Sequence, residues 1–378
     1  MRIAYLTTSD LTSTSANSVQ VMKMAQAFLR LGHDLVMTAA CQRGRRVLSE
    51  ELSERYGVRE VAEALDCSPV RGRFGIHVFN LRASWIAKKS ASEVVVTRSV
   101  GAACFSALLG LSVVFECHAP PAGFERHLFW TLLKSGKLRR IVFISDALKK
   151  IFFQRYRGLK DTDFVVAHDG VDLHQFKNHP TPELAKSKFG YPKDRLVAGY
   201  CGHLYQGRGI DLILQCAKRL PEWTFLVVGG AEADVSDVRN RLLDLDIRNV
   251  ELTGFQPNSI VPELMSVCDV LLMPYQEKVF VRGGRLDTSS WMSPLKMFEY
   301  LAMGRAIVSS DLPVLREVLD DDIAILVKPS NIGEWVERLK SLESKVLRDR
   351  LAVAARKVAR NYSWNNRARD ILCGIRYY

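Results

Sequence analysis

The chain has 378 residues, of which 48% are hydrophobic and 25% charged, and its formal net charge is +12 at pH 7. These values are typical of a globular protein with two domains of ordinary size, and they exclude a disordered or fibrous chain. No run approaches about 20 apolar residues and no secretory pattern precedes the first strand, so we expect a cytoplasmic protein without a membrane span. The eight cysteines include no Cys-x-x-Cys pair, which is typical of buried free thiols rather than of disulfides or a zinc site.

The positive charge is uneven along the chain. Residues 1–180 hold 25 Lys and Arg against 16 Asp and Glu, or +9, whereas residues 181–378 hold 28 against 25, or +3. Basic clusters occur at residues 43–46, 137–140 and 149–150. No nucleic-acid-binding motif accompanies them, so we do not expect a nucleic-acid partner. Contact with an anionic membrane or lipid pyrophosphate and a merely solvated face both stay open.

In chain order, residues 1–180 alternate between short apolar runs and segments with a helical period. The predicted strands are Ile3–Leu6, Leu35–Thr38, Val94–Thr97, Val113–Glu116, Ile141–Ile144 and Val165–Ala167. Apolar residues with a period near 3.6 from Val19 to Leu29 predict a helix after the first strand, and Gly32 ends it. Such alternation predicts an α/β fold with a doubly wound parallel sheet.

The loop between the first strand and this helix, residues 13–18, contains Ser15 and Asn17 among other small polar side chains. These side chains suit the close approach of a phosphate or a sugar. The alternative is that Ser18 or Asn17 caps the helix, and both roles can coexist. No glycine occurs from Thr7 to Ser18, so the Gly-x-Gly-x-x-Gly pattern of a dinucleotide oxidoreductase is missing.

Two prolines in His179-Pro180-Thr181-Pro182 interrupt the pattern, and we expect the link between two domains there. A second α/β pattern follows, with predicted strands Val197–Cys201, Thr224–Val228, Val250–Leu252, Val270–Met273, Ala306–Val308 and Ala324–Val327. Sites in open sheets lie beyond the carboxyl ends of the strands. The two doubly wound, Rossmann-like sheets are therefore expected to face each other across a cleft.

A glycine-rich loop, Gly202-His203-Leu204-Tyr205-Gln206-Gly207-Arg208-Gly209, follows the first strand of the second half and precedes an apolar helix. Glycines let the backbone approach a phosphate, and Arg208 can bind a phosphate through two N–H groups. Gly229 allows the next strand to turn sharply where it ends. A tight turn without a ligand is the alternative for such a loop.

The segment from Ser293 to Gly304 is the most informative one. Its apolar spacing predicts a helix that starts near Ser293, with unpaired amide groups at its N-terminus, where a diphosphate can bind. Glu299, one turn further in, can accept hydrogen bonds from a ribose diol. Lys296 either faces the diphosphate or is an exposed lysine at the start of the helix, and Glu299 has the alternative of an exposed residue stabilised by the helix dipole.

These motifs, in this order, resemble the retaining glycosyltransferases of group 1, or family 4, which have the two-domain GT-B fold. The resemblance rests on Ala16–Ala25 with Leu31-Gly32-His33, on His168-Asp169-Gly170-Val171-Asp172, on Gly202-His203 with Arg208-Gly209, and on Ser293–Gly304. It implies an acceptor-binding domain over residues 1–180 and a nucleotide-sugar-binding domain over residues 181–350. It also implies C-terminal helices over residues 351–378 that cross back to the first domain.

The resemblance further implies transfer of a sugar, with retention and without a metal, from a nucleoside diphosphate to an acceptor hydroxyl on a glycan or lipid. A UDP-sugar is the expected donor. The implied donor-binding residues are Gly202, His203, Arg208, Gly229, Phe255, Ser293, Pro294, Leu295, Lys296 and Glu299. The implied catalytic residues are His118, Arg208, Lys296 and Glu299, and the implied acceptor-side residues are Ser15, Asn17 and His118. His118 follows a strand, where the family often has a histidine near the hydroxyls of the transferred sugar.

In one respect the sequence departs from the family. The family usually has two glutamates eight residues apart, but Trp291 stands where the first is expected before Glu299. A non-catalytic sugar-nucleotide-binding protein therefore stays as an alternative. A sugar-nucleotide epimerase or phosphorylase of the same two-domain fold is a further alternative. Asp320–Asp322 is interpreted as a solvated loop rather than a metal site, and residues 279–290 are interpreted as a mobile lid.

Overall fold

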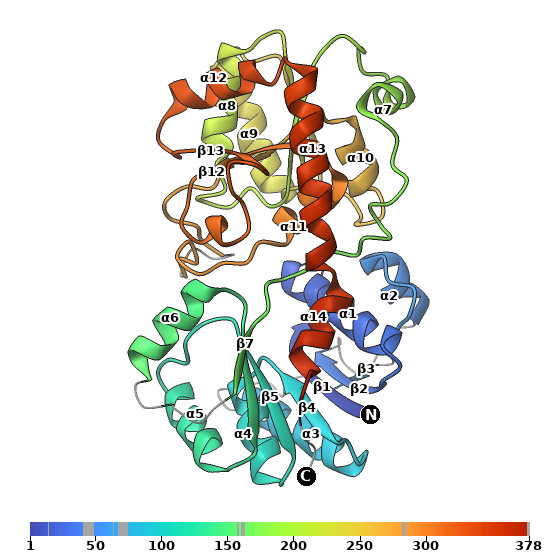
Figure 1. The fold of residues 1–378 in the computed structure, drawn as a ribbon, viewed down its shortest axis with the longest axis vertical. Coiled ribbons are helices and arrows are strands. Elements are labelled where there is room, and N and C mark those ends of the chain that lie inside the picture. The colour runs from blue at the N-terminus through green and yellow to red at the C-terminus, as the bar shows by residue number, and fades with distance from the viewer. Residues whose placement is uncertain are drawn as a thin grey trace. The chain divides into compact units, whose positions relative to one another are not determined.

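The computed structural model describes residues 1–13, 15–40, 49–62, 64–66, 75–156, 159, 163–281, 284 and 286–375. They form two compact units, which Figure 1 draws as ribbons. The first unit comprises Met1–Gly170 together with Trp364–Tyr378, and the second comprises Val171–Ser363. Each unit is an α/β layered structure with its own sheet, as the alternation of the sequence predicts.

In the described part of the first unit, a seven-stranded parallel sheet has the order β3-β2-β1-β4-β5-β6-β7. Its strands are β1 (Arg2–Asp10), β2 (Asp34–Ala40), β3 (Ala64–Asp66), β4 (Val94–Thr97), β5 (Ser112–Cys117), β6 (Leu138–Phe143) and β7 (Phe164–Val166). All but β3 were predicted from sequence. The three residues of β3 contain no apolar run, so the sequence pattern gives no signal for this edge strand.

Helices flank this sheet. They are α1 (Ala16–Arg30), α2 (Ser49–Tyr56), α3 (Gly75–Lys89), α4 (Val100–Leu108), α5 (Glu125–Lys134), α6 (Asp146–Arg155) and α14 (Trp364–Leu372). The last of these comes from the far end of the chain, coloured red in Figure 1, and packs beside α1. Ser15 is the N-cap of α1, since its hydroxyl accepts from the Ser18 amide. The prediction of a cap at Ser18 or Asn17 was therefore wrong.

In the described part of the second unit, a six-stranded parallel sheet has the order β10-β9-β8-β11-β12-β13. Its strands are β8 (Val197–Cys201), β9 (Thr224–Val228), β10 (Val250–Gly254), β11 (Val270–Met273), β12 (Ala306–Ser310) and β13 (Ile325–Val327). The flanking helices are α7 (Pro182–Phe189), α8 (Ile210–Arg219), α9 (Glu232–Asp244), α10 (Val261–Val267), α11 (Leu295–Met303), α12 (Ile332–Ser341) and α13 (Lys345–Ala359). Trp223 and Trp335 anchor the core that β8 and β9 share with α8 and α12.

The strand orders decide where each unit can hold a ligand. In the first sheet the order reverses between β1 and β4, and in the second it reverses between β8 and β11. The loops that follow these strands diverge to opposite faces of the sheet, which opens a crevice beyond their carboxyl ends. Within the described ranges, no helix has the length and hydropathy needed to cross a membrane.

Candidate active site

In the second unit, glycines bring the carboxyl ends of neighbouring strands close together. The Gly202 amide donates to the Val228 carbonyl at 2.8 Å, and the Gly229 amide donates to the Gly254 carbonyl at 2.9 Å. Gly229 has φ of +116°, and a Cβ there would lie 2.4 Å from the Gly202 carbonyl oxygen. Only glycine fits such a contact, so Gly202 and Gly229 line the same end of the sheet, as the sequence predicts.

Helix α11 begins beside this loop. Its first residue is Leu295 and its N-cap is Pro294, so the helix starts two residues later than predicted. Proline has no side-chain acceptor, so Pro294 does not cap the helix with its side chain. The Met297 amide donates to the Pro294 carbonyl at 3.0 Å, and the amides of Leu295 and Lys296 lie at the helix start, where an anion can bind. The Tyr300 hydroxyl accepts from the Cys201 amide at 2.8 Å. This bond ties the helix to the end of β8.

Lys296 is buried beneath the glycine-rich loop. Its Nζ lies 3.7 Å from the centroid of the Tyr200 ring, and a Cβ on Gly202 would lie 2.6 Å from it. This ammonium makes no hydrogen bond to any residue that the structure describes. Burial, followed by the positive charge of Arg208, lowers the pKa of Lys296 well below its usual range. The alternative of an exposed lysine at the helix start is therefore excluded.

Arg208 shares an aromatic neighbour with Lys296. Its NH1 donates to the Tyr275 hydroxyl at 3.1 Å. The Arg208 Cζ and the Lys296 Nζ lie 5.3 and 5.4 Å from the centroid of the Tyr275 ring. Burial acts to lower the pKa of Arg208, but the adjacent tyrosines outweigh it and raise the pKa. Neither cation forms an ion pair with a carboxylate among the described residues, so their charges are available to a bound anion.

The other predicted donor-side residues surround this pair less closely. The His203 ring stacks on Tyr205 at 4.7 Å, and the His203 carbonyl accepts from the Tyr200 hydroxyl at 2.5 Å. Glu299 is half-buried, and its negative charge acts on Lys296. Ser293 is buried, whereas Phe255 after β10 is 55% exposed.

The sequence analysis interpreted residues 279–290, after β11, as a mobile lid, but it did not predict that this segment binds the glycine-rich loop. The Gln276 amide donates to the Gly207 carbonyl at 2.9 Å, and the Phe280 amide donates to the Gln206 carbonyl at 3.2 Å. The Asp287 carboxylate accepts from the Val279 amide at 2.9 Å. The start of this segment is therefore hydrogen-bonded to the glycine-rich loop. Residues 282, 283 and 285, which the lid interpretation includes, lie outside the described residues.

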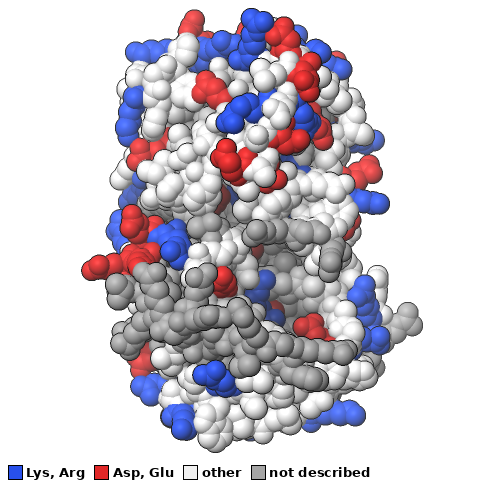
Figure 2. Space-filling model, turned by 180° about the vertical axis from the view of Figure 1, so that it is seen from behind, with Lys and Arg blue, Asp and Glu red and all other residues white. Residues whose placement is uncertain are grey.

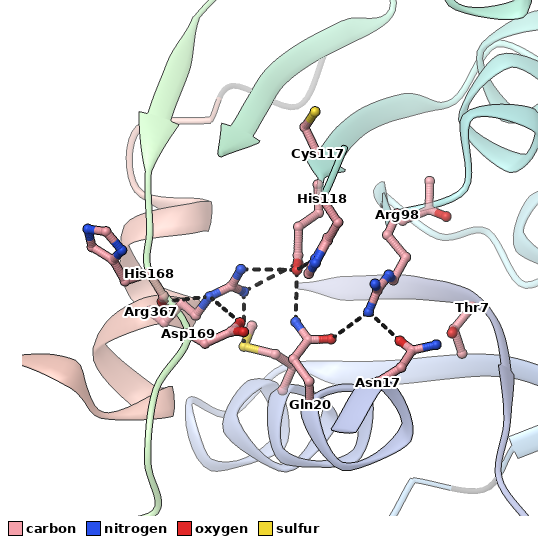
Figure 3. A network of polar contacts seen from close by, with 12 residues as sticks. Thr7, Asn17, Gln20, Arg98, Cys117, His118, His168, Asp169 and Arg367 are labelled. Carbon is pink, nitrogen blue, oxygen red and sulfur yellow. Dashed lines mark hydrogen bonds and ion pairs between the residues drawn. The ribbon is translucent and has the colours of Figure 1, made fainter. Parts of the chain in front are cut away.

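In the first unit, the predicted residues His118 and Asn17 belong to one polar network (Figure 3). Glu116, at the end of β5, accepts from Gln20 at 2.8 Å and lies 2.5 Å from the His118 Nε2. The Asn17 side chain accepts from Arg98, which also donates to Gln20 at 3.3 Å. The loop after β4 and helix α1 thus meet the end of β5, at the switch point of the sheet.

The network controls the charge of its members. Burial raises the pKa of Glu116, but Arg367 and His118 outweigh burial and hold it well below its usual range. Burial, with the positive charge of Arg98, lowers the pKa of His118 to about 4, although Glu116 acts in the opposite direction. His118 is therefore neutral at pH 7. Sequence reasoning named His118 and Asn17 but missed Glu116, Arg98 and Arg367 as their partners.

Comparison with known proteins agrees with this architecture. The Glycosyltransferase Family 4 model matches residues 18–175, and the Glycosyl transferases group 1 model matches residues 195–345. A teichuronic acid biosynthesis glycosyltransferase of Bacillus subtilis, TuaH, is 26% identical over 250 residues, which cover 64% of this chain and 59% of TuaH. The chain spans about half the length of the curated relatives that it matches.

Solved structures show the same fold over nearly the whole chain. A glycosyltransferase from Rickettsia africae has a TM-score of 0.75 at 17% identity and covers 99% of both chains. HepE of Anabaena, crystallised with UDP, has a TM-score of 0.73 at 16% identity and covers 98% of both chains. The two sheets, the two family models and these structures together show that the chain belongs to glycosyltransferase group 1, family 4, with the GT-B fold.

Proposed function

We propose that the chain transfers a sugar, with retention, from a UDP-sugar to an acceptor hydroxyl in the synthesis of a polysaccharide, glycolipid or other glycoconjugate. One observation carries this proposal: the buried ammonium of Lys296 has no hydrogen-bond partner in the described structure and lies beside Arg208. Such a cation needs an anion, and the N-terminus of α11 adds amide donors. That HepE was crystallised with UDP supports a uridine diphosphate donor, and the likeness to TuaH, which is named for teichuronic acid biosynthesis, supports a role in glycan synthesis.

The reaction places developing negative charge on the leaving diphosphate. Arg208, Lys296 and the amides at the start of α11 stabilise that charge, while Glu299 accepts hydrogen bonds from the ribose hydroxyls. The bond from the sugar carbon to the phosphate oxygen breaks, and a bond to the acceptor oxygen forms on the same face. The departing phosphate takes the proton of the acceptor hydroxyl. In this proposal the second unit holds the donor, and Ser15, Asn17 and His118 of the first unit serve the acceptor and the transferred sugar.

Glu299 and Arg208 are expected to control nucleotide affinity. Replacing either with alanine should weaken UDP binding by about 2 kcal/mol or more, roughly 30-fold in Kd, because each removes a charged partner from a buried site. Isothermal titration calorimetry measures this directly. Arg248→Ala, at an arginine side chain that is 87% exposed, is the matched control and should bind like the unmodified protein. Unchanged affinity in both site variants would contradict the donor assignment.

Trp291 favours a second candidate, a non-catalytic sugar-nucleotide-binding protein, because a tryptophan replaces the glutamate expected eight residues before Glu299. A transferase turns over the donor when an acceptor glycan or lipid is supplied. An epimerase or phosphorylase of this fold needs no acceptor hydroxyl of that kind, and a binding protein never consumes the donor. Product analysis with and without an acceptor separates the three.

We also propose that the protein contacts a membrane peripherally, on its cytoplasmic face. Of the basic clusters, residues 43–46 lie outside the described residues. Arg140 is buried against Asp163 and two carbonyls of α14, so it cannot reach a membrane. Figure 2 shows basic and acidic side chains interspersed on the face that it draws. On this face, charge alone therefore does not mark a binding surface.

Helix α3 offers a better surface because it combines exposed apolar and basic side chains. Leu81 and Trp85 are 50% and 51% exposed, and the Lys89 Nζ lies 5.8 Å from the centroid of a Trp85 ring. The helix also carries Arg82 and Lys88, and no acidic residue. Apolar and aromatic side chains flanked by lysine and arginine are typical of helices that lie on an anionic lipid surface.

The membrane proposal predicts salt-sensitive vesicle binding through α3. The protein should sediment with vesicles that contain phosphatidylserine at low salt and be released at high salt, since each Lys or Arg near the surface contributes about 1 kcal/mol. The double variant Lys88→Glu/Lys89→Glu should lose this binding. The double variant Lys345→Glu/Arg348→Glu, on α13, should keep it. Failure of the unmodified protein to bind at either salt concentration would count against a membrane role.

A further inference from the structure

Glu116 lies at the centre of the network in the first unit. Its side chain and that of Arg367 are each only 2% exposed. The Arg367 NH2 donates to Glu116 Oε1 at 3.0 Å, and NH1 is 3.3 Å from Oε2. Gln20 donates to the same Oε1 at 2.8 Å. Gln20 and Arg367, both labelled in Figure 3, therefore donate to one carboxylate. This carboxylate cannot rotate without breaking several charge-assisted hydrogen bonds.

The remaining neighbour of Glu116 Oε1 is the Nε2 of His118, at 2.5 Å. An ionised carboxylate can only accept, so Nε2 must carry the hydrogen. A neutral ring with Nε2–H has its lone pair on Nδ1. The His118 side chain is 20% exposed, in contrast to Glu116. The histidine ring is therefore the part of this pair that a ligand can reach.

Arg367 connects Glu116 to several elements of the first unit. From α14 its Nε donates to the His168 carbonyl at 3.0 Å and lies 3.9 Å from the Asp169 carboxylate. Its NH1 also contacts the sulfur of Met24 on α1 at 3.4 Å. The Arg367 side chain is held at so many points that it has one orientation, and its hydrogen bonds to Glu116 fix the orientation of that carboxylate as well.

We propose that Glu116 and Arg367 are positioning residues for His118: the carboxylate, which Arg367 fixes in place, accepts from Nε2 and so holds the ring in one tautomer and one orientation, with Nδ1 able to accept a hydrogen bond from a hydroxyl of the transferred sugar. The sugar in this inference rests on the proposed function. The state of the histidine ring does not, since the contacts are those of the protein alone. A donor whose sugar lacks that hydroxyl is then a poor substrate, because the buried acceptor stays unpaired.

The charges around His118 predict in which direction its pKa should shift when a neighbour is replaced. Three charged groups shift the pKa of His118: Arg98 after β4, Glu116 on β5 and Arg367 on α14. Asp169 and Tyr5 in turn act on the pKa of Arg367. Arg367 lowers the pKa of His118 and Glu116 raises it. Removing the Arg367 charge should therefore raise this pKa, and removing the Glu116 charge should lower it further. If the two residues had a purely structural role, their removal would not be expected to shift the pKa of His118 in opposite directions.

The first experiment measures the tautomer and the pKa of the His118 ring directly, in the full chain and without a sugar nucleotide. Two-bond proton–nitrogen NMR on protein with 15N-labelled histidine distinguishes the two tautomers, and the His118→Ala variant assigns the signal. At pH 7 we expect a single Nε2–H form that protonates only near pH 4. Arg367→Met should shift the titration upward, whereas Arg367→Lys, which keeps the cation, should restore it at least in part. An Nδ1–H ring, or an averaged mixture at pH 7, overturns the inference.

The second experiment is a double-mutant cycle on sugar transfer. Glu116→Gln keeps the shape of the side chain but replaces one acceptor oxygen with an NH2 group, which faces the N–H donors of its neighbours. It should lower kcat by about 10- to 100-fold in the unmodified background, the range seen when hydrogen-bonded partners are removed from metal-bound histidines. In the His118→Ala background it should cost less than about twofold, because the residues act as a unit. An equal loss in both backgrounds shows a merely structural role and overturns the inference.

The two arms separate failure of this inference from failure of the proposed function. If no donor is turned over but the ring has the expected tautomer and titration, the positioning stands and the transferase assignment fails. If transfer occurs but the tautomer is wrong, the positioning fails alone. Should Glu116→Gln not fold, the Arg367→Met and Arg367→Lys pair decides the same question through the direction of the titration shift.

Discussion

Lys296→Met should stabilise the free protein and, at the same time, abolish tight nucleotide binding. The lysine is buried beside a second cation and has no hydrogen-bond partner in the described structure. Replacing a buried amine that has no hydrogen-bond partner in the described structure with an apolar side chain of similar length removes its desolvation cost, a gain of about 1 to 3 kcal/mol. A bound diphosphate would lose its nearest ammonium, which costs about 2 kcal/mol or more, at least roughly 30-fold in Kd. Thermal unfolding without a ligand and calorimetry with UDP measure the two effects.

The chain offers a matched control in Lys186, a second buried lysine with the opposite surroundings. Its Nζ lies 2.6 Å from the Asp269 carboxylate and donates to the Arg195 carbonyl at 2.8 Å. Lys186→Met strands a buried carboxylate, which should cost about 3 to 5 kcal/mol of stability and leave nucleotide affinity unchanged. If Lys296→Met were also destabilising, Lys296 would be a structural residue and the anion site would lose its main support.

The contrast between these lysines shows where sequence reasoning stops. Both stand in short helices with apolar neighbours. Only the tertiary structure reveals that Lys186 has a carboxylate partner, whereas Lys296 has no ion-pair partner among the residues that the structure describes. The glycine-rich loop and the start of α11 were predictable because each is a local pattern of backbone requirements. Gly202 and Lys296 come together because the strand order places β8 next to β11, and the βαβ pattern makes that placement plausible.

The network around His118 was predictable only in part, for a physical reason. His118 follows an apolar strand, so its place at a strand end could be inferred. Its partners cannot be read from spacing, since Arg367 meets Glu116 across 251 residues of chain and Arg98 meets Asn17 across 81. Glu116 itself lies inside an apolar run, where a buried carboxylate signals a buried cation somewhere in the fold. That signal was available, although it does not identify the cation.

The segment after β11 leads to the second large effect, at Gly207. This glycine has φ of +85°, and a Cβ there would lie 1.9 Å from the Lys278 carbonyl oxygen. Two backbone segments meet at this point, so neither can move away cheaply. Gly207→Ala should therefore cost about 2 to 5 kcal/mol of stability, the sum of left-handed strain and overpacking. It should also weaken UDP binding, because Arg208 is the next residue.

Gly190→Ala is a control that separates the cost of left-handed backbone strain from the cost of the steric contact at Gly207. Gly190 has a similar φ of +77°, but no atom lies within 4 Å of the Cβ position, so its replacement should cost only about 1 to 2 kcal/mol and leave UDP affinity unchanged. Denaturant unfolding and calorimetry on the two variants compare them directly. Equal costs would mean that residues 276–280 move away from the glycine-rich loop at little energetic cost. A larger cost at Gly207, with weaker UDP binding, would make this segment part of the donor site, since it holds the loop that carries Arg208 in one conformation.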